Sequence, residues 1–433
     1  MGALTISFIG FSGILILAFL RFPLALSMGL VGVIGFGELT SYRAAFSNMG
    51  RLVMDLGQNY SLSVLPLFIL MGLLIEKGGM AKQLYKSAYT FLGDKKGGLA
   101  MSTVVACGMF SAISGSSIAT AATMSKVAMP EMRRYKYADS LSTASIAAGG
   151  TLGILIPPSV ILVIYGILTE QSIGKLFMAG FLPGMMGILF YTLAVYFVVS
   201  RNPSLGPAGE KSNWAQRIAA LKNVWSTVAL FIFVIGGIFI GLFSATEAAG
   251  MGAAGAFLIV LLSGNLKFSG YLDVFRDASL LAAKLFALLF GASMFSNFLN
   301  RAGFTDALLG IINSFELSGI AVIFIILLIY ILLGCIFESM SMILLTVPIF
   351  APLVQTLGFD LIWFGILVVV VTEISLITPP IGLNVFVLKG VIKNVSVGTI
   401  FYGVTPFWIS DIIRLLILTL IPGIALFLPS MMF

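Results

Sequence analysis

Two pairs of consecutive prolines, Pro157-Pro158 and Pro379-Pro380, lie within long apolar stretches and can create binding sites from the backbone itself. Proline fixes φ, lacks an N–H donor and clashes with the preceding turn, so each pair should break the helix that carries it. A broken helix leaves carbonyl oxygens without partners, and these suit a hard cation such as sodium, which prefers several oxygen ligands. The pairs lie 222 positions apart (379 − 157) in a chain of 433 residues, which predicts the same device once in each half.

Glycine and hydroxyl residues gather near both proline pairs. The first half has a serine-rich segment at 111–117 and glycines at 149–153, and the second half has small and polar residues at 334–341 and 375–378. Small side chains let an ion approach the backbone closely. The competing interpretation is a close-packed interface between membrane helices, where Gly and Ser are common. The occurrence of the pattern in both halves favours two ion sites.

Three carboxylates lie in apolar surroundings, namely Glu247, Glu338 and Glu373. Ionisable groups inside a membrane are costly, so they are treated first as functional candidates. Glu338 lies in the second small-residue segment and Glu373 about one turn before the second break, so both are candidates for ion coupling. Glu247 follows Ser244, and this spacing predicts a helix cap with an acidic first turn instead.

An enzymatic interpretation of the serines lacks a general base. The chain has no histidine, which leaves only a Ser-Lys pair, Ser117 with Lys126, for an intramembrane hydrolase. Lys126 is expected instead to extend from its helix toward the membrane surface. No GxxxxGK[ST] phosphate motif occurs, and histidine metal sites are excluded. The protein is therefore not expected to be an enzyme, to need a cofactor other than coupling sodium ions, or to bind nucleic acid.

The elements that must position these residues are membrane helices. Hydrophobic residues make up 59% of the chain and charged residues 9%, and the mean hydropathy is +1.11. A spanning helix needs about 20 apolar residues, and roughly ten such windows occur, which predicts an all-α polytopic membrane protein. The first window, Leu4 to Leu20, lacks a basic start and a cleavage site, so it is expected to be a span and not a signal peptide.

The charges predict two re-entrant hairpins of opposite orientation. Basic residues flank the stretch 97–132 on both sides, so both of its ends should face the cytoplasm, and it is too short for two crossings. A counterpart at 317–358 has no basic flank, so its ends should face the outside. Because each hairpin precedes a broken helix, the sequence predicts two inverted-topology repeats of the kind found in secondary transporters. The predicted divisions are a first repeat at 1–200 with its broken helix at 138–168, a cytoplasmic linker or surface helix at 201–224, and a second repeat at 225–433 with its broken helix at 361–388.

The chain resembles the large membrane subunit of tripartite ATP-independent periplasmic (TRAP) transporters over essentially its whole length. The resemblance rests on GMFSAISGSSIATAATM (108–124), GGTLGILIPPSVILVIYG (149–166) and LITPPIGLNVFVLKG (376–390). It implies an elevator-type ion-transporter fold in the bacterial inner membrane, and sodium-coupled import of a small organic acid anion such as a C4-dicarboxylate or a sialic acid. It also implies two protein partners, a small four-helix membrane subunit and a periplasmic substrate-binding protein, besides the lipid bilayer.

The resemblance further implies residues for each site. One sodium ion would be bound by oxygens of Ser111, Ser114, Gly153, Ile156 and Pro158. A second would be bound by oxygens of Gly334, Ser375, Thr378 and Ile381, with Ser375 at a position where glycine is frequent. We expect the anion between the hairpin tips, where helix N-termini favour negative charge, held by Ser116, Ser117, Ser339 and Asn384. A proton-coupled transporter of the same fold, using Glu338 and Glu373, is the alternative.

Overall fold

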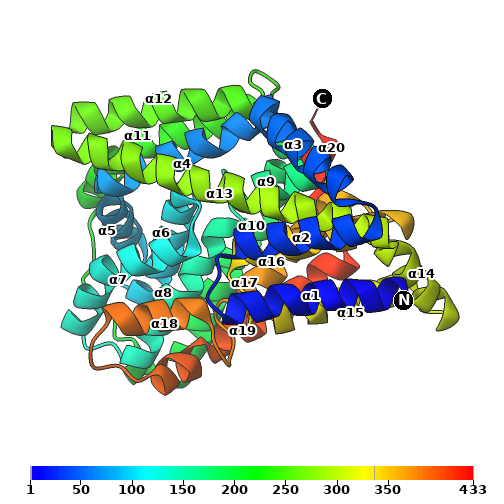
Figure 1. Ribbon diagram of the computed structural model, residues 1–433. Helices are drawn as coiled ribbons and strands as arrows, with labels where there is room; N and C mark the ends of the chain where they lie inside the picture. Colours follow the sequence, from blue (N-terminus) through cyan, green and yellow to red (C-terminus); the bar gives the residue numbers. More distant parts are fainter. Residues whose placement is uncertain (1, 336, 433) are drawn as a thin grey trace.

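The computed structural model describes residues 2–335 and 337–432, and all regular elements in these ranges are helices (Figure 1). The prediction of an all-helical membrane protein is confirmed. Among the described residues, seven helices are long and apolar enough to cross a membrane, and shorter apolar helices accompany them. The roughly ten windows expected from hydropathy therefore include both full-length spans and the shorter helices of the hairpins and breaks.

The first half runs from five N-terminal α-helices through a hairpin and a broken helix to one long helix. Its elements are α1 (Ala3–Phe19), α2 (Leu24–Leu39), α3 (Tyr42–Gln58), η1 (Tyr60–Ser63), α4 (Val64–Lys77), α5 (Met80–Leu92), α6 (Gly98–Ser114), α7 (Ser117–Arg134), α8 (Asp139–Thr151), η2 (Leu152–Ile154), α9 (Val160–Leu168), α10 (Ile173–Arg201) and η3 (Pro203–Leu205). Helices α6 and α7 form the first hairpin, and α8 and α9 are the two parts of the first broken helix.

The second half repeats this order of hairpin, broken helix and long helix. Its elements are α11 (Trp214–Phe239), α12 (Ala245–Ser263), α13 (Phe268–Ala302), α14 (Phe304–Ser314), α15 (Gly319–Gly334), α16 (Ser339–Thr356), α17 (Leu361–Ser375), α18 (Leu383–Val391), α19 (Val397–Leu420) and α20 (Gly423–Ser430). The starts of α7 and α16 differ by 222 positions (339 − 117), as do those of α8 and α17 (361 − 139). The spacing of the proline pairs therefore extends to whole helices.

The helices begin and end where their caps dictate. Gly115 ends α6 in the left-handed region at φ 61°, and Ser116 then caps α7 by accepting a hydrogen bond from the amide of Ala119. Asn213 forms a capping box at the start of α11, which continues unbroken to Phe239. The boundary predicted at residue 224 therefore falls inside a helix, because the capping box starts that helix at Trp214.

Both proline pairs interrupt their helices over more than the prolines themselves. The α-helical pattern is lost over residues 152–159 in the first half and 376–382 in the second. Proline disfavours the helical conformation in the residue before it and blocks the hydrogen bond to the preceding turn, so that turn unwinds as well. The Pro157-Pro158 and Pro379-Pro380 peptide bonds are both cis.

The helices form an outer layer and an inner block. Helix α12 lies beside α11 and α4, α4 lies beside α13, and α13 packs along α2. Helices α12, α11, α4 and α13 occupy the upper part of Figure 1, with α2 below α13. The inner block contains both hairpins and both broken helices, with α8 against α6, α7 and α19, and α10 against α17 and α19. Every residue of α17 is buried, so the inner block holds the core and surrounds the breaks.

Candidate functional site

The first hairpin tip lies directly against the first break. A β-carbon on Gly153 would lie 2.6 Å from Cβ and 2.8 Å from Oγ of Ser111, so only glycine fits there. The Ser114 hydroxyl lies 2.8 Å from that of Thr120, and the Ser111 hydroxyl donates to the same oxygen at 3.5 Å. The tip of hairpin α6–α7 therefore brings hydroxyl oxygens to the unwound segment after α8.

The remaining residues predicted for the first ion site flank this contact. The side chain of Ile156 packs into the space left by Gly184, where a β-carbon would lie 2.7 Å from its Cγ1. The carbonyl oxygen of Pro158 would lie 3.9 Å from a β-carbon on Gly115, at the hairpin tip. Burial is complete over residues 151–160. The structure thus gathers the predicted residues of the first ion site in one enclosed region.

The second hairpin meets the second break in the same way. A β-carbon on Gly334 would overlap the side chain of Ser375, so the end of α15 touches the end of α17 through a glycine. The Ser375 hydroxyl donates to the carbonyl oxygen of Thr372 at 2.7 Å, and the Thr378 hydroxyl donates to that of Ile374 at 3.0 Å. Ile381, the remaining predicted residue, is 37% exposed. Gly334 and Ser375 therefore meet as predicted for the second site, Thr378 lies within the unwound segment, and Ile381 is exposed.

Two of the four predicted substrate residues meet across the halves. Asn384, in α18, donates from Nδ2 to the hydroxyl oxygen of Ser117 at 2.7 Å and to the carbonyl oxygen of Ala147 at 3.1 Å. Asn384 is fully buried, and its Oδ1 has no partner among the described residues. Ser116 serves as the cap of α7. Ser339 begins α16 and is buried, and among the described residues it makes no hydrogen bond to Ser117 or Asn384.

The three carboxylates singled out in the sequence have different surroundings. Glu247 forms the capping box with Ser244 that its spacing predicted. Glu338 is the N-cap of α16, where its carboxylate accepts hydrogen bonds from the amide and hydroxyl of Ser341 at 3.4 Å. Glu373 is fully buried and pairs with Arg414, whose Nη2 lies 2.5 Å from Oε2 of the carboxylate. Neither Glu338 nor Glu373 is therefore a free carboxylate.

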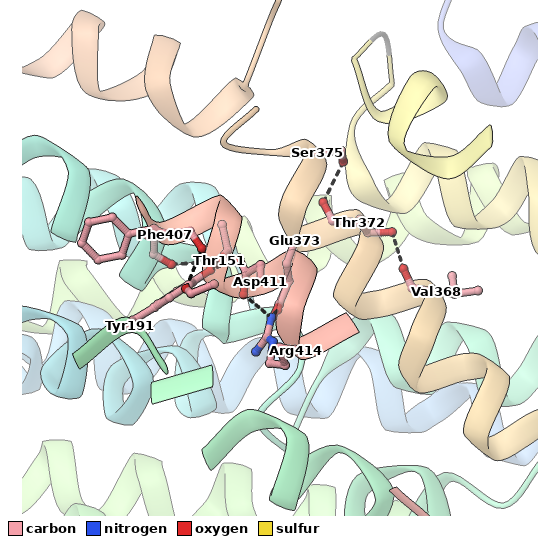
Figure 2. Close-up of polar contacts among 11 residues, drawn as sticks. Thr151, Tyr191, Val368, Thr372, Glu373, Ser375, Phe407, Asp411 and Arg414 are labelled. Atoms are coloured by element: carbon pink, nitrogen blue, oxygen red, sulfur yellow. Dashed lines mark hydrogen bonds and ion pairs between the residues drawn. The ribbon is translucent and has the colours of Figure 1, made fainter. Parts of the chain in front are cut away.

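Sequence reasoning missed a buried polar cluster around Arg414. Figure 2 shows its members, which we call the Arg414 cluster: Thr151, Tyr191, Glu373, Asp411 and Arg414. All five are fully buried, and Nη2 of Arg414 also lies 2.9 Å from Oδ1 of Asp411. The available signal was the Asp411 and Arg414 pair, two opposite charges at i, i+3 inside an apolar span.

The Ser-Lys pair is not assembled. Lys126 is exposed in α7, whose first residue is Ser117. Nine residues of helix separate the two by about 13 Å along the axis. The lysine amine is thus out of reach of the serine hydroxyl.

The chain is similar to membrane components of known transporters. Residues 11–424 match the family described as "Tripartite ATP-independent periplasmic transporter, DctM component". The chain is 33% identical to the C4-dicarboxylate TRAP transporter large permease protein DctM of Pseudomonas aeruginosa, over 87% of this chain and 88% of that protein. It is 32% identical to the ectoine TRAP transporter large permease protein TeaC of Halomonas elongata, over 96% and 97%.

Two further similarities concern domain arrangement and fold. The sialic acid TRAP transporter permease protein SiaT of Haemophilus influenzae is 28% identical over 96% of this chain but only 67% of its own length. The crystal structure of the Alcanivorax borkumensis YdaH transporter, which is described as having an unusual topology, superposes with a TM-score of 0.63. That match covers 89% of this chain and 90% of the other at 12% identity, so it shows a shared fold alone.

Proposed function

The chain belongs to the DctM component family of TRAP transporters, and we propose that it imports a small organic anion together with sodium ions. As a large permease of this family it is a transporter component of the bacterial inner membrane and not an enzyme. Sodium as the driving ion, an organic acid anion as the substrate and an elevator movement are the parts of the proposal that go beyond membership of the family.

One observation carries the proposal of sodium coupling: a hairpin tip meets an unwound helix through a glycine in both halves. Only glycine fits at position 153, against Ser111, and only glycine fits at position 334, against Ser375. These contacts bring serine hydroxyl groups to the two breaks, and the hydroxyls of Ser375 and Thr378 lie beside carbonyl oxygens at the end of α17. Several neutral oxygens close together are the environment that a hard cation prefers. Coordination by neutral oxygens also avoids burying an unpaired carboxylate at membrane depth.

The contact between Ser117 and Asn384 supports an anion site between the halves. The Ser117 hydroxyl oxygen accepts the hydrogen of Asn384, which leaves its own hydrogen free to be donated to an anion. Ser117 is also the first residue of α7, an 18-residue helix whose N-terminal dipole favours negative charge. The relatives named for C4-dicarboxylates and for sialic acid guide the choice of a small organic acid as substrate.

Two protein partners complete the proposed transporter. TRAP large permeases work with a small membrane subunit and a periplasmic binding protein. In this chain the outer layer presents exposed apolar side chains, such as Ile232, Leu258 and Leu281, and we assign this layer to contacts with lipid and the small subunit. In the proposed elevator movement the inner block shifts relative to this layer and carries the ions and the anion.

The proton-coupled alternative loses support from the surroundings of its two carboxylates. Glu373 is paired with Arg414 and Glu338 caps α16, so both carboxylates are already engaged in contacts within the fold. Neutral oxygen ligands for sodium therefore account better for the contacts between hairpin and helix at the two breaks.

Transport in proteoliposomes tests the proposal directly. Vesicles containing this chain and the small subunit, supplied with the binding protein loaded with a labelled organic acid, should accumulate the anion only under an inward sodium gradient. Replacing sodium with choline should abolish uptake. Unchanged uptake in choline would contradict sodium coupling, and uptake driven by a pH gradient without sodium would establish the proton alternative.

A further inference from the structure

The Arg414 cluster connects four helices of the inner block. Tyr191 in α10 donates a hydrogen bond to Asp411 in α19 and lies 3.1 Å from the hydroxyl of Thr151, the last residue of α8. Arg414, also in α19, continues the chain of contacts to Glu373 in α17 (Figure 2). A continuous line of polar contacts therefore runs from α8 to α17.

The two ends of this line lie next to the two predicted ion sites. Thr151 lies two residues before Gly153, and Glu373 lies two residues before Ser375. The separation of Thr151 and Glu373 is 222 positions (373 − 151), the same as that of the proline pairs. The line thus joins equivalent positions, each in the last turn of a helix before its break.

Close packing prevents Thr151 or Glu373, at the two ends of the cluster, from moving without a change in the rest of the cluster. All five residues are fully buried, and Nη1 of Arg414 occupies space that any side chain at position 187 would fill. Two carboxylates share one guanidinium, and Oε1 of Glu373 has no partner among the described residues. A buried polar group cannot exchange its protein partner for water, so a shift at the end of α8 changes the contacts available at α17.

We propose that the Arg414 cluster positions both helix breaks together and thereby couples occupancy of the two sodium sites. This inference rests on the sodium-coupled function proposed above. An ion bound after Gly153 holds the end of α8 in place, the contacts through Tyr191 and Asp411 hold Arg414, and Arg414 holds the end of α17 beside the second site. The first ion therefore raises the affinity for the second without touching it.

Sodium titration of a variant without the central hydroxyl tests this coupling. In proteoliposomes with the full complex, uptake by the wild-type protein should rise with a Hill coefficient above one. Tyr191→Phe keeps the ring against Phe407 but removes both hydroxyl contacts. We expect a Hill coefficient near one and a half-saturating sodium concentration raised about five-fold or more, with the rate at saturating sodium retained.

Two further variants separate coupling from folding. Tyr330→Phe is the matched control, because that tyrosine is also fully buried and its hydroxyl also has a hydrogen bond, which comes from Thr346 within the second hairpin. It should leave the steepness of the sodium curve unchanged. Thr151→Val removes the α8 end of the line, keeps the bond between Tyr191 and Asp411, and should reproduce the effect of Tyr191→Phe on the sodium curve.

The outcomes distinguish this inference from the function on which it rests. Steep sodium dependence in the wild type that neither Tyr191→Phe nor Thr151→Val reduces would overturn the coupling role alone. Equal flattening by Tyr330→Phe would also overturn it, because the effect would then follow from any lost buried hydroxyl. Uptake by the wild type that ignores sodium would overturn the proposed function and this inference with it.

Discussion

The two helix breaks share a motif and differ in their surroundings. Residues 151–160 around the first break are buried throughout, whereas Pro379, Pro380 and Ile381 at the second break are exposed. Helices α6 and α10 enclose the first break, with glycines that admit Ile156. The same break in the helix is therefore enclosed in one half and accessible in the other, and we expect an ion to reach the proposed second site with less movement of the protein.

The breaks differ in charge as well as in exposure. Thr151 before the first break contributes a neutral hydroxyl, while Glu373 at the equivalent position contributes a carboxylate paired with Arg414. A buried charge requires its partner, but a buried hydroxyl requires only one hydrogen bond. The second break should therefore depend more strongly on its neighbours than the first.

The largest expected effect follows from removing the guanidinium. Arg414→Met leaves Glu373 and Asp411 buried without their cation, which should destabilise the protein by about 3–5 kcal/mol. Thermal unfolding of the purified protein, followed by tryptophan fluorescence, measures the loss. Arg134→Met is the control, because Arg134 is mostly exposed, 3.7 Å from Glu131, and such surface pairs contribute only about 0–1 kcal/mol.

A triple variant tests whether the unpaired charges cause the loss of stability in Arg414→Met. Adding Glu373→Gln and Asp411→Asn to Arg414→Met removes every formal charge from the cluster and makes the second break as neutral as the first. Because no unpaired ion remains, much of the lost stability should return. A triple variant as unstable as Arg414→Met alone would show that packing of the arginine, and not its charge, distinguishes the two breaks.

Glycine substitutions compare the two ion sites themselves. Gly153→Ala should reduce sodium-driven uptake more than ten-fold, because the new methyl group would lie 2.6 Å from Cβ and 3.2 Å from Cα of Ser111. Gly334→Ala should be equally harmful, since it overlaps the side chain of Ser375. Only the second can be rescued: Ser375→Gly removes the overlapping atoms, whereas Ser111→Gly still leaves the Cα in the way.

A glycine in open space provides the control for both. Gly236 lies in α11, and a β-carbon there would meet nothing within 4 Å, so Gly236→Ala should leave uptake unchanged. Uptake is measured at saturating and at limiting sodium. A distorted ion site should lower uptake mainly at limiting sodium, whereas poor membrane insertion should lower uptake at both concentrations. Wild-type sodium dependence in Gly153→Ala would remove the first site from the mechanism.

Labelling of single cysteines measures the difference in exposure directly. Ser159 and Ile381 are equivalent positions, 222 apart, and the first is fully buried whereas the second is 37% exposed. With Cys335 replaced by serine, a polar maleimide should label Ile381→Cys readily and Ser159→Cys slowly, since reaction requires an accessible thiolate. Sodium should protect Ile381→Cys, and equal rates at the two positions would contradict the comparison.

The sequence predicts the framework of both sites because that framework depends on local rules. Proline chemistry predicts the unwound segments, the charge flanks of 97–132 predict a hairpin between two cytoplasmic ends, and Ser244 with Glu247 predicts a capping box that the structure confirms. Each of these signals acts over a few residues, or through the number of residues needed to cross a membrane.

The unpredicted features depend on packing between distant segments. Glu373 was a candidate for ion coupling in the sequence because nothing there places Arg414, 41 positions later, beside it. The sequence also does not predict that Pro379 is exposed and Pro157 is buried, since both prolines lie in similar apolar motifs. The role of Glu338 as a helix cap is easier to predict from the sequence, because a carboxylate just before a helix start is a common cap.

The smallest expected effect concerns the contact that joins the halves, between Ser117 and Asn384. Ser117→Ala removes one hydrogen bond of about 1 kcal/mol, and Asn384→Ala removes that bond together with the one to Ala147, so each should raise the anion concentration for half-maximal uptake about five-fold or more. If Asn384 acts by orienting the Ser117 hydroxyl toward the anion, the double variant should lose no more affinity than Asn384→Ala alone. Additive losses would instead show that each side chain binds the anion independently. The anion would then contact both halves, and the hydrogen bond between Ser117 and Asn384 would play no part in binding it.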